Sequence, residues 1–246
     1  MYIIIEAKSR SMRLSSKAIY ECVLTTVCPS GRINSASIGV NVTEKDGKFV
    51  IKTNIYEGTD SARNLLYYFK NYNWNNDKKN KKRNEDRSKI SISFITREDT
   101  DLLVHAALKG HSCEENEFDI SEYEYSDGIP YHKRGYISAI CRLVKLKRRK
   151  KVDQLGEAFF YECSFFVEKW LPGNAKFKIE PISRACGALI EASIEATRLS
   201  QSKKFAKKER LLLIERFLSI AKKTGSESDR KIANFISKRI KEIKNR

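Results

Sequence analysis

The first third of the chain alternates apolar and polar positions in the pattern of β-strands. These segments are rich in β-branched residues, and the first alternates about Tyr20, Cys22 and Leu24. Strands are predicted at residues 20–27, 33–42 and 48–55. A Pro-Ser-Gly-Arg turn and an Asp-Gly turn separate them. Three strands joined by tight turns predict an antiparallel meander, the beginning of a small barrel or sandwich.

After residue 55 the spacing of apolar residues changes from the two-residue period of a strand to the period of about 3.6 residues of a helix. Gly58-Thr59-Asp60-Ser61 opens a short helix whose apolar face begins with Ala62 and Leu65. Residues 71–89 are polar and Lys-rich, which predicts a flexible surface loop. Further strands are predicted at residues 90–96, 136–146 and 158–170, and a short helix at 102–108. Lys147–Lys151 falls in the connection between the last two of these strands.

From Pro181 onward the apolar positions follow a helical period. The first helix turns Ala185, Leu189, Ala192, Ala196 and Leu199 inward. A second helix, about 204–223, ends at Gly225, and Ser226–Asp229 resembles a capping box for a third. The third is expected to bury Ile232, Phe235, Ile236, Ile240 and Ile243. Strands followed by helices predict an α+β protein, with an N-terminal domain at 1–180 and a helical C-terminal region at 181–246.

Composition places the protein among cytoplasmic globular proteins. No run of about 18 apolar residues exists, and the apolar segment 1–5 is too short for a signal peptide. Six cysteines without a CxxC pair are expected to be free and mostly buried. GxSxG, Walker A and GxGxxG sequences are absent, which leaves hydrolase, nucleoside-triphosphatase and Rossmann functions without support.

The net charge of +17 would suit a nucleic acid partner. Three segments, 77–89, 145–151 and 203–246, together carry a charge of +20, so the rest of the chain is near neutral at about −3. Segments 145–151 and 203–246 could form a nucleic-acid surface, with Tyr136 and Phe159–Tyr161 as stacking residues. The alternative is a solvated hairpin tip and solvated helix faces, with those aromatic residues in the core.

The segment Gly58–Asn64 is the most informative for chemistry. It places a glycine, two hydroxyl side chains, Arg63 and unpaired backbone N–H groups at the start of a helix. Such a terminus can bind a phosphate, because the N–H groups and the helix dipole both favour an anion. The alternative is that Thr59 or Asp60 only caps the helix. The residues alone leave both possibilities open.

Four segments occur together in a recognisable order: Glu21–Val27 (ECVLTTV), Gly31–Val40 (GRINSASIGV), Gly58–Leu65 (GTDSARNL) and Arg184–Leu199 (RACGALIEASIEATRL). In this order they resemble the mainly archaeal FMN-binding split-barrel proteins catalogued as domain of unknown function 447. The barrel segments are shared more loosely with flavin reductases and pyridoxamine-phosphate-oxidase-like proteins. The helix at 184–199 is the most specific part of the resemblance, which extends from Tyr20 to the last helix.

The resemblance implies a split β-barrel with a C-terminal helical extension, FMN as cofactor, and a homodimer with FMN near the subunit interface. It implies that Thr59, Ser61 and Asn64, after the turn at Gly58, hold the FMN phosphate. Along the isoalloxazine ring it places Ala36, Ser37, Ile38 and Gly39. By the same resemblance, residues 71–89 are an insertion that proteins of this family lack. The family has no assigned reaction, so no catalytic residue is carried over.

The function that follows is a flavin-dependent oxidoreductase or flavin reductase-like protein of unknown substrate. A flavin-storing or regulatory protein without turnover needs the same pocket and is an alternative. The nucleic-acid-binding protein described above, with the barrel as a scaffold, is another.

Two further groups of residues could ligate a metal. His105, His111 and Cys113 do not match a standard zinc spacing, and a structural role is favoured for His105. Glu191 and Glu195 lie one helical turn apart, but no His accompanies them, and a surface or interface ion pair is favoured. No metal is expected.

Overall fold

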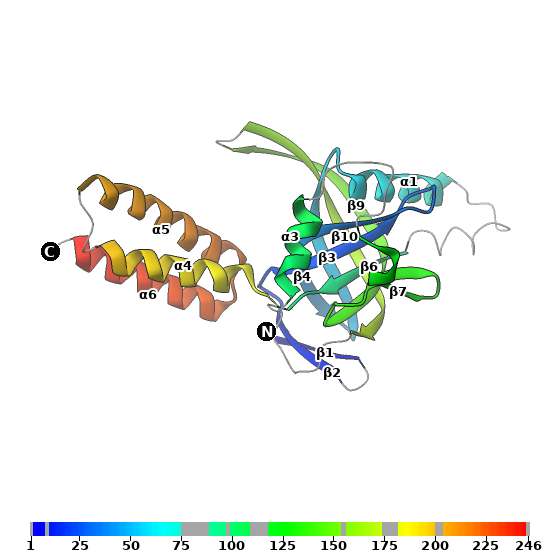
Figure 1. The fold of residues 1–246 in the computed structure, drawn as a ribbon, viewed down its shortest axis with the longest axis horizontal. Helices are drawn as coiled ribbons and strands as arrows, with labels where there is room; N and C mark the ends of the chain where they lie inside the picture. Colours follow the sequence, from blue (N-terminus) through cyan, green and yellow to red (C-terminus); the bar gives the residue numbers. More distant parts are fainter. Residues whose placement is uncertain are drawn as a thin grey trace. The chain divides into compact units, whose positions relative to one another are not determined.

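The computed structural model describes residues 2–7, 10–74, 89–96, 99–108, 118–153, 156–173, 182–199 and 204–244 (Figure 1). The chain divides into two compact units. The barrel unit contains Tyr2–Leu14 and Glu21–Pro181, and the helical unit contains Ser15–Tyr20 and Ile182–Arg246.

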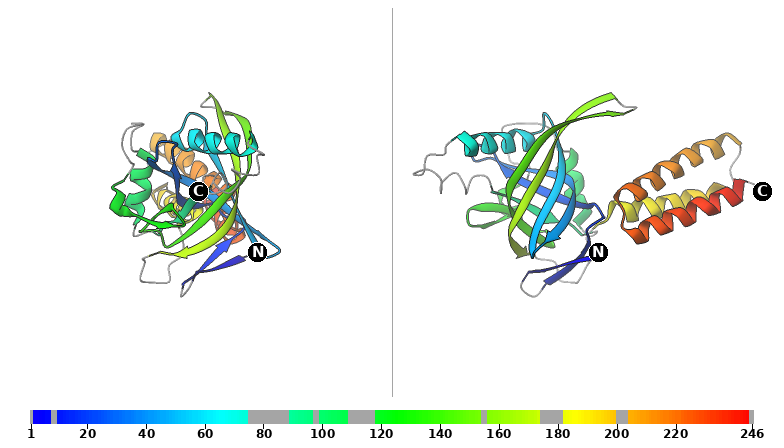
Figure 2. Two further views of the ribbon diagram at one scale, coloured as in Figure 1. Left: turned by 90° about the vertical axis from the view of Figure 1, so that its right-hand side faces the viewer. Right: turned by 180° about the vertical axis from the view of Figure 1, so that it is seen from behind.

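The barrel unit is built on six strands that close into one barrel (Figure 2). They are β3 (Tyr20–Val27), β4 (Ile33–Lys45), β5 (Lys48–Tyr56), β6 (Lys89–Phe94), β9 (Ile137–Asp153) and β10 (Gly156–Pro172). Their order around the barrel is β10-β5-β4-β3-β6-β9. Along β5, Ile51, Thr53 and Ile55 are buried while the residues between them face solvent. The predicted α+β fold, an antiparallel split β-barrel with a C-terminal helical extension, is confirmed.

Smaller elements complete this unit. They are the two-stranded sheets β1 (Tyr2–Ala7) with β2 (Arg10–Ser15) and β7 (Tyr123–Ser126) with β8 (Ile129–His132), the helices α1 (Asp60–Trp74) and α3 (Thr100–Leu108), and the 3-10 helix Ile120–Glu122. The predicted loop at 71–89 begins later than expected, because α1 continues to Trp74 and β6 starts at Lys89. Residues 75–88 lie outside the described residues.

The turns of the meander follow the predicted chemistry. Asp46 and Gly47, between β4 and β5, have φ values of 54° and 70°. Gly31, between β3 and β4, has a φ of 91°. Both turns need the left-handed region that Gly, and to a lesser degree Asp, adopt at low cost. The predicted hairpins are confirmed.

The last two strands form a hairpin that extends beyond the barrel (Figure 2). Pairing of β9 with β6 ends at Arg142, and pairing of β10 with β5 ends at Phe160, whereas β9 and β10 stay paired from Ile137 to Asp153. The prediction that Lys147–Lys151 lies in a connection is therefore wrong. These residues belong to β9, where Glu157 and Glu162 of the paired strand offset part of their charge.

The helical unit holds α4 (Arg184–Leu199), α5 (Lys204–Thr224) and α6 (Glu227–Lys244). Its core consists of Ala185, Ala188, Leu189, Ala192, Ile214, Leu218, Ala221, Ala233, Ile236 and Ile240. The capping box is confirmed, since the Asp229 carboxylate accepts hydrogen bonds from the Ser226 amide and hydroxyl, both at 2.7 Å. Ser15–Tyr20 joins this unit through Ile19, whose amide donates to the Thr224 carbonyl at 2.7 Å.

The prediction of the buried face of α6 is partly wrong. Ile232 and Phe235 are 45% and 64% exposed, whereas Ala233 is fully buried. The inward stripe of α6 is Ala233, Ile236 and Ile240, and positions one residue before this stripe turn about 100° away from it. The side chain of Ile243 lies outside the described residues.

Within the described ranges, no helix is long and apolar enough to span a membrane.

Candidate functional site

The corner between β5 and α1 is built around Gly58 and Thr59. Gly58 has a φ of 88°, so the chain reverses at a residue without a side chain. The Thr59 hydroxyl donates to the Tyr56 carbonyl at 2.9 Å and accepts from the Ala62 amide at 3.2 Å. Thr59 therefore caps α1, as the structural alternative predicted. Its hydroxyl already has both partners within the chain.

Asp60 begins α1 and links it to the β3–β4 turn. Its buried carboxylate accepts a hydrogen bond from Arg32 Nη2 at 3.0 Å and another from Arg63, one turn further along the helix. Burial acts to raise the pKa of Asp60, but the hydrogen bonds from Arg63 and Arg32 outweigh it and lower this pKa. The guanidinium groups of Arg32 and Arg63 are thereby held beside the first turn of α1.

Ser61 and Asn64 face the interior of the barrel unit, 3% and 4% exposed. Asn34 Nδ2 donates to Ser61 Oγ at 3.0 Å and to Thr26 Oγ1 at 3.1 Å. Asn64 Nδ2 also donates to Thr26 Oγ1, at 3.0 Å. These four side chains form a buried polar cluster that fastens α1 to β3 and β4. Thr26 and Asn34 were not among the predicted site residues, although a polar residue within a largely apolar strand is a signal for such a role.

The segment Ala36–Gly39 lies where β4 separates from β5. Ala36, Ser37 and Gly39 are half-buried and Ile38 is buried. The β4–β5 register runs from Lys45 to Val40, which pairs with Thr53. Beyond it, the Thr53 hydroxyl donates to the Gly39 carbonyl at 2.8 Å. The described pairing of β4 with β5 does not continue to Ala36–Gly39, and β5 beyond this point pairs with β10.

The structure therefore arranges the predicted cofactor residues in two groups. Gly58, Thr59, Ser61 and Asn64 lie at the start of α1, and Ala36–Gly39 follows the opened edge of β4. Helix α1 packs on both β4 and β5. Asn34, two residues before Ala36, connects the groups through its hydrogen bond to Ser61.

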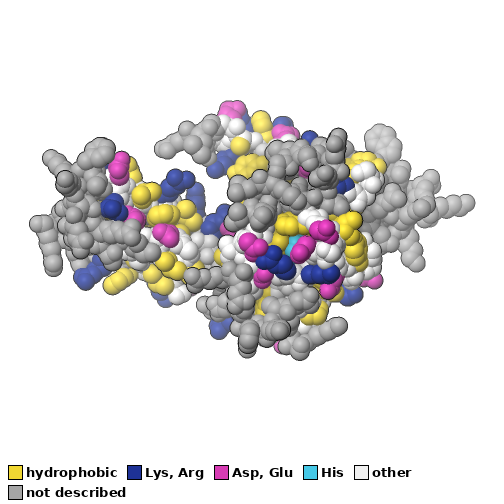
Figure 3. Space-filling view, viewed as in Figure 1, with side chains coloured by type: hydrophobic (Ala, Val, Ile, Leu, Met, Phe, Trp, Pro, Cys, Tyr) yellow, Lys and Arg dark blue, Asp and Glu magenta, His cyan; other side chains and the backbone are white. Residues whose placement is uncertain are grey.

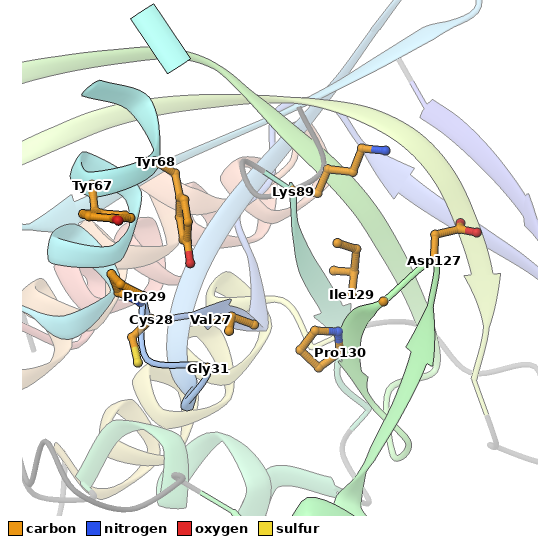
Figure 4. Close-up of a pocket in the computed structure, with 11 residues that line it drawn as sticks. Val27, Cys28, Pro29, Gly31, Tyr67, Tyr68, Lys89, Asp127, Ile129 and Pro130 are labelled. Carbon is orange, nitrogen blue, oxygen red and sulfur yellow. The ribbon is translucent and has the colours of Figure 1, made fainter. Parts of the chain in front are cut away.

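A separate cavity of about 390 Å³ lies at the β3–β4 turn (Figure 4). Its walls come from the β3–β4 turn, α1, the start of β6 and the β7–β8 hairpin. They consist of Val27, Cys28, Pro29, Gly31, Tyr67, Tyr68, Lys89, Asp127, Gly128, Ile129 and Pro130. The volume lies in the range of small-molecule pockets. None of the eight predicted cofactor residues lines it.

Cys28, in the wall of this cavity, differs from the other described cysteines. Its Sγ lies 2.9 Å from the Ser30 hydroxyl. Desolvation acts to raise the pKa of Cys28, but hydrogen bonds with Ser30 and Arg32 outweigh it and lower this pKa. Burial raises the pKa of Cys22, Cys141 and Cys163.

The candidate metal ligands do not form a cluster in the described part of the chain. His111 and Cys113 lie outside the described residues, and so does the side chain of His105 in α3. Glu195 forms an ion pair with Arg210 of α5, and Glu191 is exposed.

Comparison with known proteins gives a family for part of the chain. The family described as a protein of unknown function (DUF447) matches residues 183–238, which confirms the resemblance to that family. No curated protein matches.

Many solved structures are similar in fold at low sequence identity, including the following three. An FMN-bound protein of the DUF447 family from Methanosarcina mazei is 19% identical, with a TM-score of 0.43 over 90% of this chain and 95% of that one. Nitrilotriacetate monooxygenase component B from Bacillus cereus is 15% identical, with a TM-score of 0.49 over 68% and 79%. Flavoredoxin from Methanosarcina acetivorans is 11% identical, with a TM-score of 0.45 over 72% and 80%.

Proposed function

We propose that this protein binds FMN in its barrel unit and is a flavin-dependent oxidoreductase or flavin reductase-like protein. The observation that carries the proposal is the separation of β4 from β5 at Gly39, next to a strand that runs directly into the start of α1. FMN is an elongated ligand with a flat ring at one end and a phosphate at the other. The ring would lie along β4 where it separates from β5, and the phosphate would lie at the N-terminus of α1.

The phosphate end is assigned to the first turn of α1. Backbone N–H groups that lack intrahelical partners, together with the helix dipole, favour an anion there. Gly58 leaves this turn accessible, and Arg63 adds a positive charge at its side. The Ser61 side chain is hydrogen-bonded to Asn34, and the Asn64 side chain is hydrogen-bonded to Thr26. These two side chains therefore support the phosphate site indirectly, by holding α1 in position.

The ring is assigned to Ala36–Gly39, which lies beyond the described β4–β5 pairing and would present its backbone groups to the polar edge of an isoalloxazine. When bound, FMN supplies the hydride and electron transfer that protein side chains cannot perform. The protein residues bind and orient it. No residue is assigned a catalytic role.

The proposed assembly rests on the family resemblance, and the proposed location rests on the amino-acid sequence. We propose a cytoplasmic homodimer with FMN near the subunit interface. We also propose a functional division between the barrel domain at 1–180 and the helical region at 181–246.

Titration of the purified protein with FMN and with riboflavin tests the proposal. Binding should shift the flavin absorption bands, and FMN should bind at least 10-fold more tightly than riboflavin, since charge-assisted hydrogen bonds to the phosphate contribute more than about 1.4 kcal/mol. No binding of either flavin would overturn the proposal. Equal affinities would overturn the phosphate assignment.

Two variants separate the ring site from the phosphate site. Ser37→Trp should block the opened edge of β4 and abolish binding of both flavins, whereas Ser37→Ala should retain it. Arg63→Gln should weaken FMN binding and leave riboflavin binding unchanged. Oxidation of NAD(P)H by the FMN-loaded protein then distinguishes an enzyme from a flavin-storage protein.

A further inference from the structure

We propose that the outer face of the β9–β10 hairpin, continued by the end of β5, binds single-stranded nucleic acid. This function is independent of flavin binding. The sequence predicted a nucleic-acid surface on segments 145–151 and 203–246. The surface proposed from the structure is one face of three adjacent strands, β9, β10 and β5, in the barrel unit.

The basic residues of β9 that share this face occupy alternate positions. They are Lys145, Lys147, Arg149 and Lys151, all exposed. Because side chains of a strand alternate between its two faces, these four point the same way and follow one another at about 7 Å. A row of cations at this spacing can follow the phosphates of an extended strand.

Two aromatic side chains lie beside the row on the same face. Phe160 of β10 pairs with Arg149 of β9 on one side and with Tyr56 of β5 on the other. The Tyr56 and Phe160 rings are 6.3 Å apart with an interplanar angle of 60°, and Tyr56 is 51% exposed. An exposed tyrosine beside a half-buried phenylalanine, bordered by cations, can stack unpaired bases while the cations contact their backbone.

The charge of this face is strongly positive. Lys52 of β5, opposite Ser164, adds a fifth cation to the row. Among the described positions of this face from Lys145 to Lys151 and their partners on β10 and β5, Glu162 is the one carboxylate. Its ion pair with Arg149, at 3.3 Å, joins two half-exposed groups and is therefore weak enough to exchange for a phosphate.

The opposite face of the hairpin is already neutralised. Arg148 donates two hydrogen bonds to Glu57, at 3.0 and 2.8 Å, and lies 4.1 Å from the Phe159 ring centroid. Lys150 pairs with Glu157 at 2.6 Å. Arg148 and Lys150 of this face are therefore paired with carboxylates, and the nucleic-acid surface is assigned to the outer face, where cations outnumber carboxylates.

The aromatic pair favours a single strand over a duplex. Aromatic rings on a sheet face cannot stack on bases that are already stacked inside a double helix, whereas they can stack on unpaired bases. The structure also corrects the predicted stacking residues, since Tyr136 and Tyr161 are buried. Tyr56 takes their place.

Anisotropy of a fluorescein-labelled 15-nucleotide oligo-U, titrated with the full-length protein at several salt concentrations, tests this inference. With about four phosphates contacted, log K should fall with log salt with a slope of about −3. Lys145→Gln combined with Lys147→Gln should reduce the slope by about 1.4. Lys238→Gln combined with Lys241→Gln removes the same charge from exposed positions of α6 and should leave the slope unchanged.

Tyr56→Ala should weaken oligo-U binding about 10-fold, and Tyr56→Phe should restore it, since stacking needs the ring and not the hydroxyl. Tyr125→Ala, at an exposed tyrosine of β7, is the matched control and should have no effect. A double-stranded RNA of equal length should bind more weakly than oligo-U.

Three results would overturn the inference. One is an equal loss of oligo-U affinity in the Lys145/Lys147 and Lys238/Lys241 double variants, which would mean that binding depends only on the net charge of the protein. Another is a duplex affinity equal to or above that of oligo-U. The third is a Tyr56→Ala variant that changes the oligomeric state in sedimentation but not the affinity for oligo-U, which would identify the face as a contact between copies of this chain.

Discussion

Asn34 donates a hydrogen bond from its side-chain amide to the Ser61 hydroxyl at 3.0 Å, inside the barrel unit. The contact joins the middle of the meander to the first turn of the helix that follows it. It therefore sets the position of the α1 N-terminus relative to the opened edge of β4, on which the proposed flavin site depends.

Loss of this contact should destabilise the fold. Asn34→Ala leaves the buried hydroxyl of Ser61 without its donor and removes one of the two donors to Thr26, which should cost about 1–3 kcal/mol of unfolding free energy. Urea denaturation measures the change. Asn54→Ala, at an exposed position of β5, is the control and should change stability by less than about 0.5 kcal/mol. Equal effects of the two substitutions would contradict the assigned role of Asn34.

Asp60 should make stability depend on pH in the acid range. Its pKa is lowered from 3.8 in the folded state, because the hydrogen bonds from Arg63 and Arg32 outweigh the effect of burial. The stabilisation is therefore complete well above pH 3.8 and is lost as the pH falls below this value. Asp60→Asn should cost about 3 kcal/mol at pH 7, because Arg32 keeps a buried charge.

Denaturation of the wild type and Asp60→Asn at pH 7, 5 and 3 tests this prediction. The difference in unfolding free energy should persist at pH 5 and narrow at pH 3. A difference that is the same at all three values would mean that ionisation of Asp60 is not its source.

Protonation of His132 should destabilise the folded protein, whereas protonation of a histidine that gains an ion pair stabilises it. His132 is 0% exposed, and its Nε2 has no hydrogen-bond partner among the described residues. Burial, aided by Arg134, lowers its pKa from 6.5 to about 4. Protonation therefore favours the unfolded chain, and stability falls as the pH drops from about 6.5 towards 4.

His132→Phe should be more stable than the wild type by about 1 kcal/mol at pH 7, because an unsatisfied buried N–H is removed next to Phe118 and Tyr123. The advantage should grow to about 4 kcal/mol at pH 4. An NMR titration of His132 supplies the direct check. A midpoint near 6.5 would show that the side chain is not held neutral by burial.

Cys28 should react faster with thiol reagents than the other described cysteines. Its lowered pKa increases the thiolate fraction at neutral pH, whereas Cys22, Cys141 and Cys163 are buried with raised pKa values. Brief iodoacetamide labelling at pH 7, followed by peptide mass spectrometry, should find Cys28 modified first. Cys186, which is exposed, is the internal reference, and faster labelling of Cys186 would refute the prediction.

The sequence by itself determined the features that depend on neighbours along the chain. The Asp46-Gly47 hairpin and the Ser226–Asp229 capping box are formed by residues within a few positions of one another. Their geometry follows from backbone preferences and local hydrogen bonds, so the pattern of residues was sufficient. The inward stripe of α4 was also predicted, since Ala185, Leu189 and Ala192 repeat at the helical period.

Only the tertiary structure decided what distant segments do to one another. It closed the barrel by pairing β5 with β10, turned the side chains of Ser61 and Asn64 inward onto Asn34 and Thr26, and left Phe235 exposed. It also placed Tyr56 beside Phe160, more than a hundred residues away in the sequence. A polar side chain satisfies its hydrogen bonds with whichever partner the packing brings near, and residue type alone does not specify that partner.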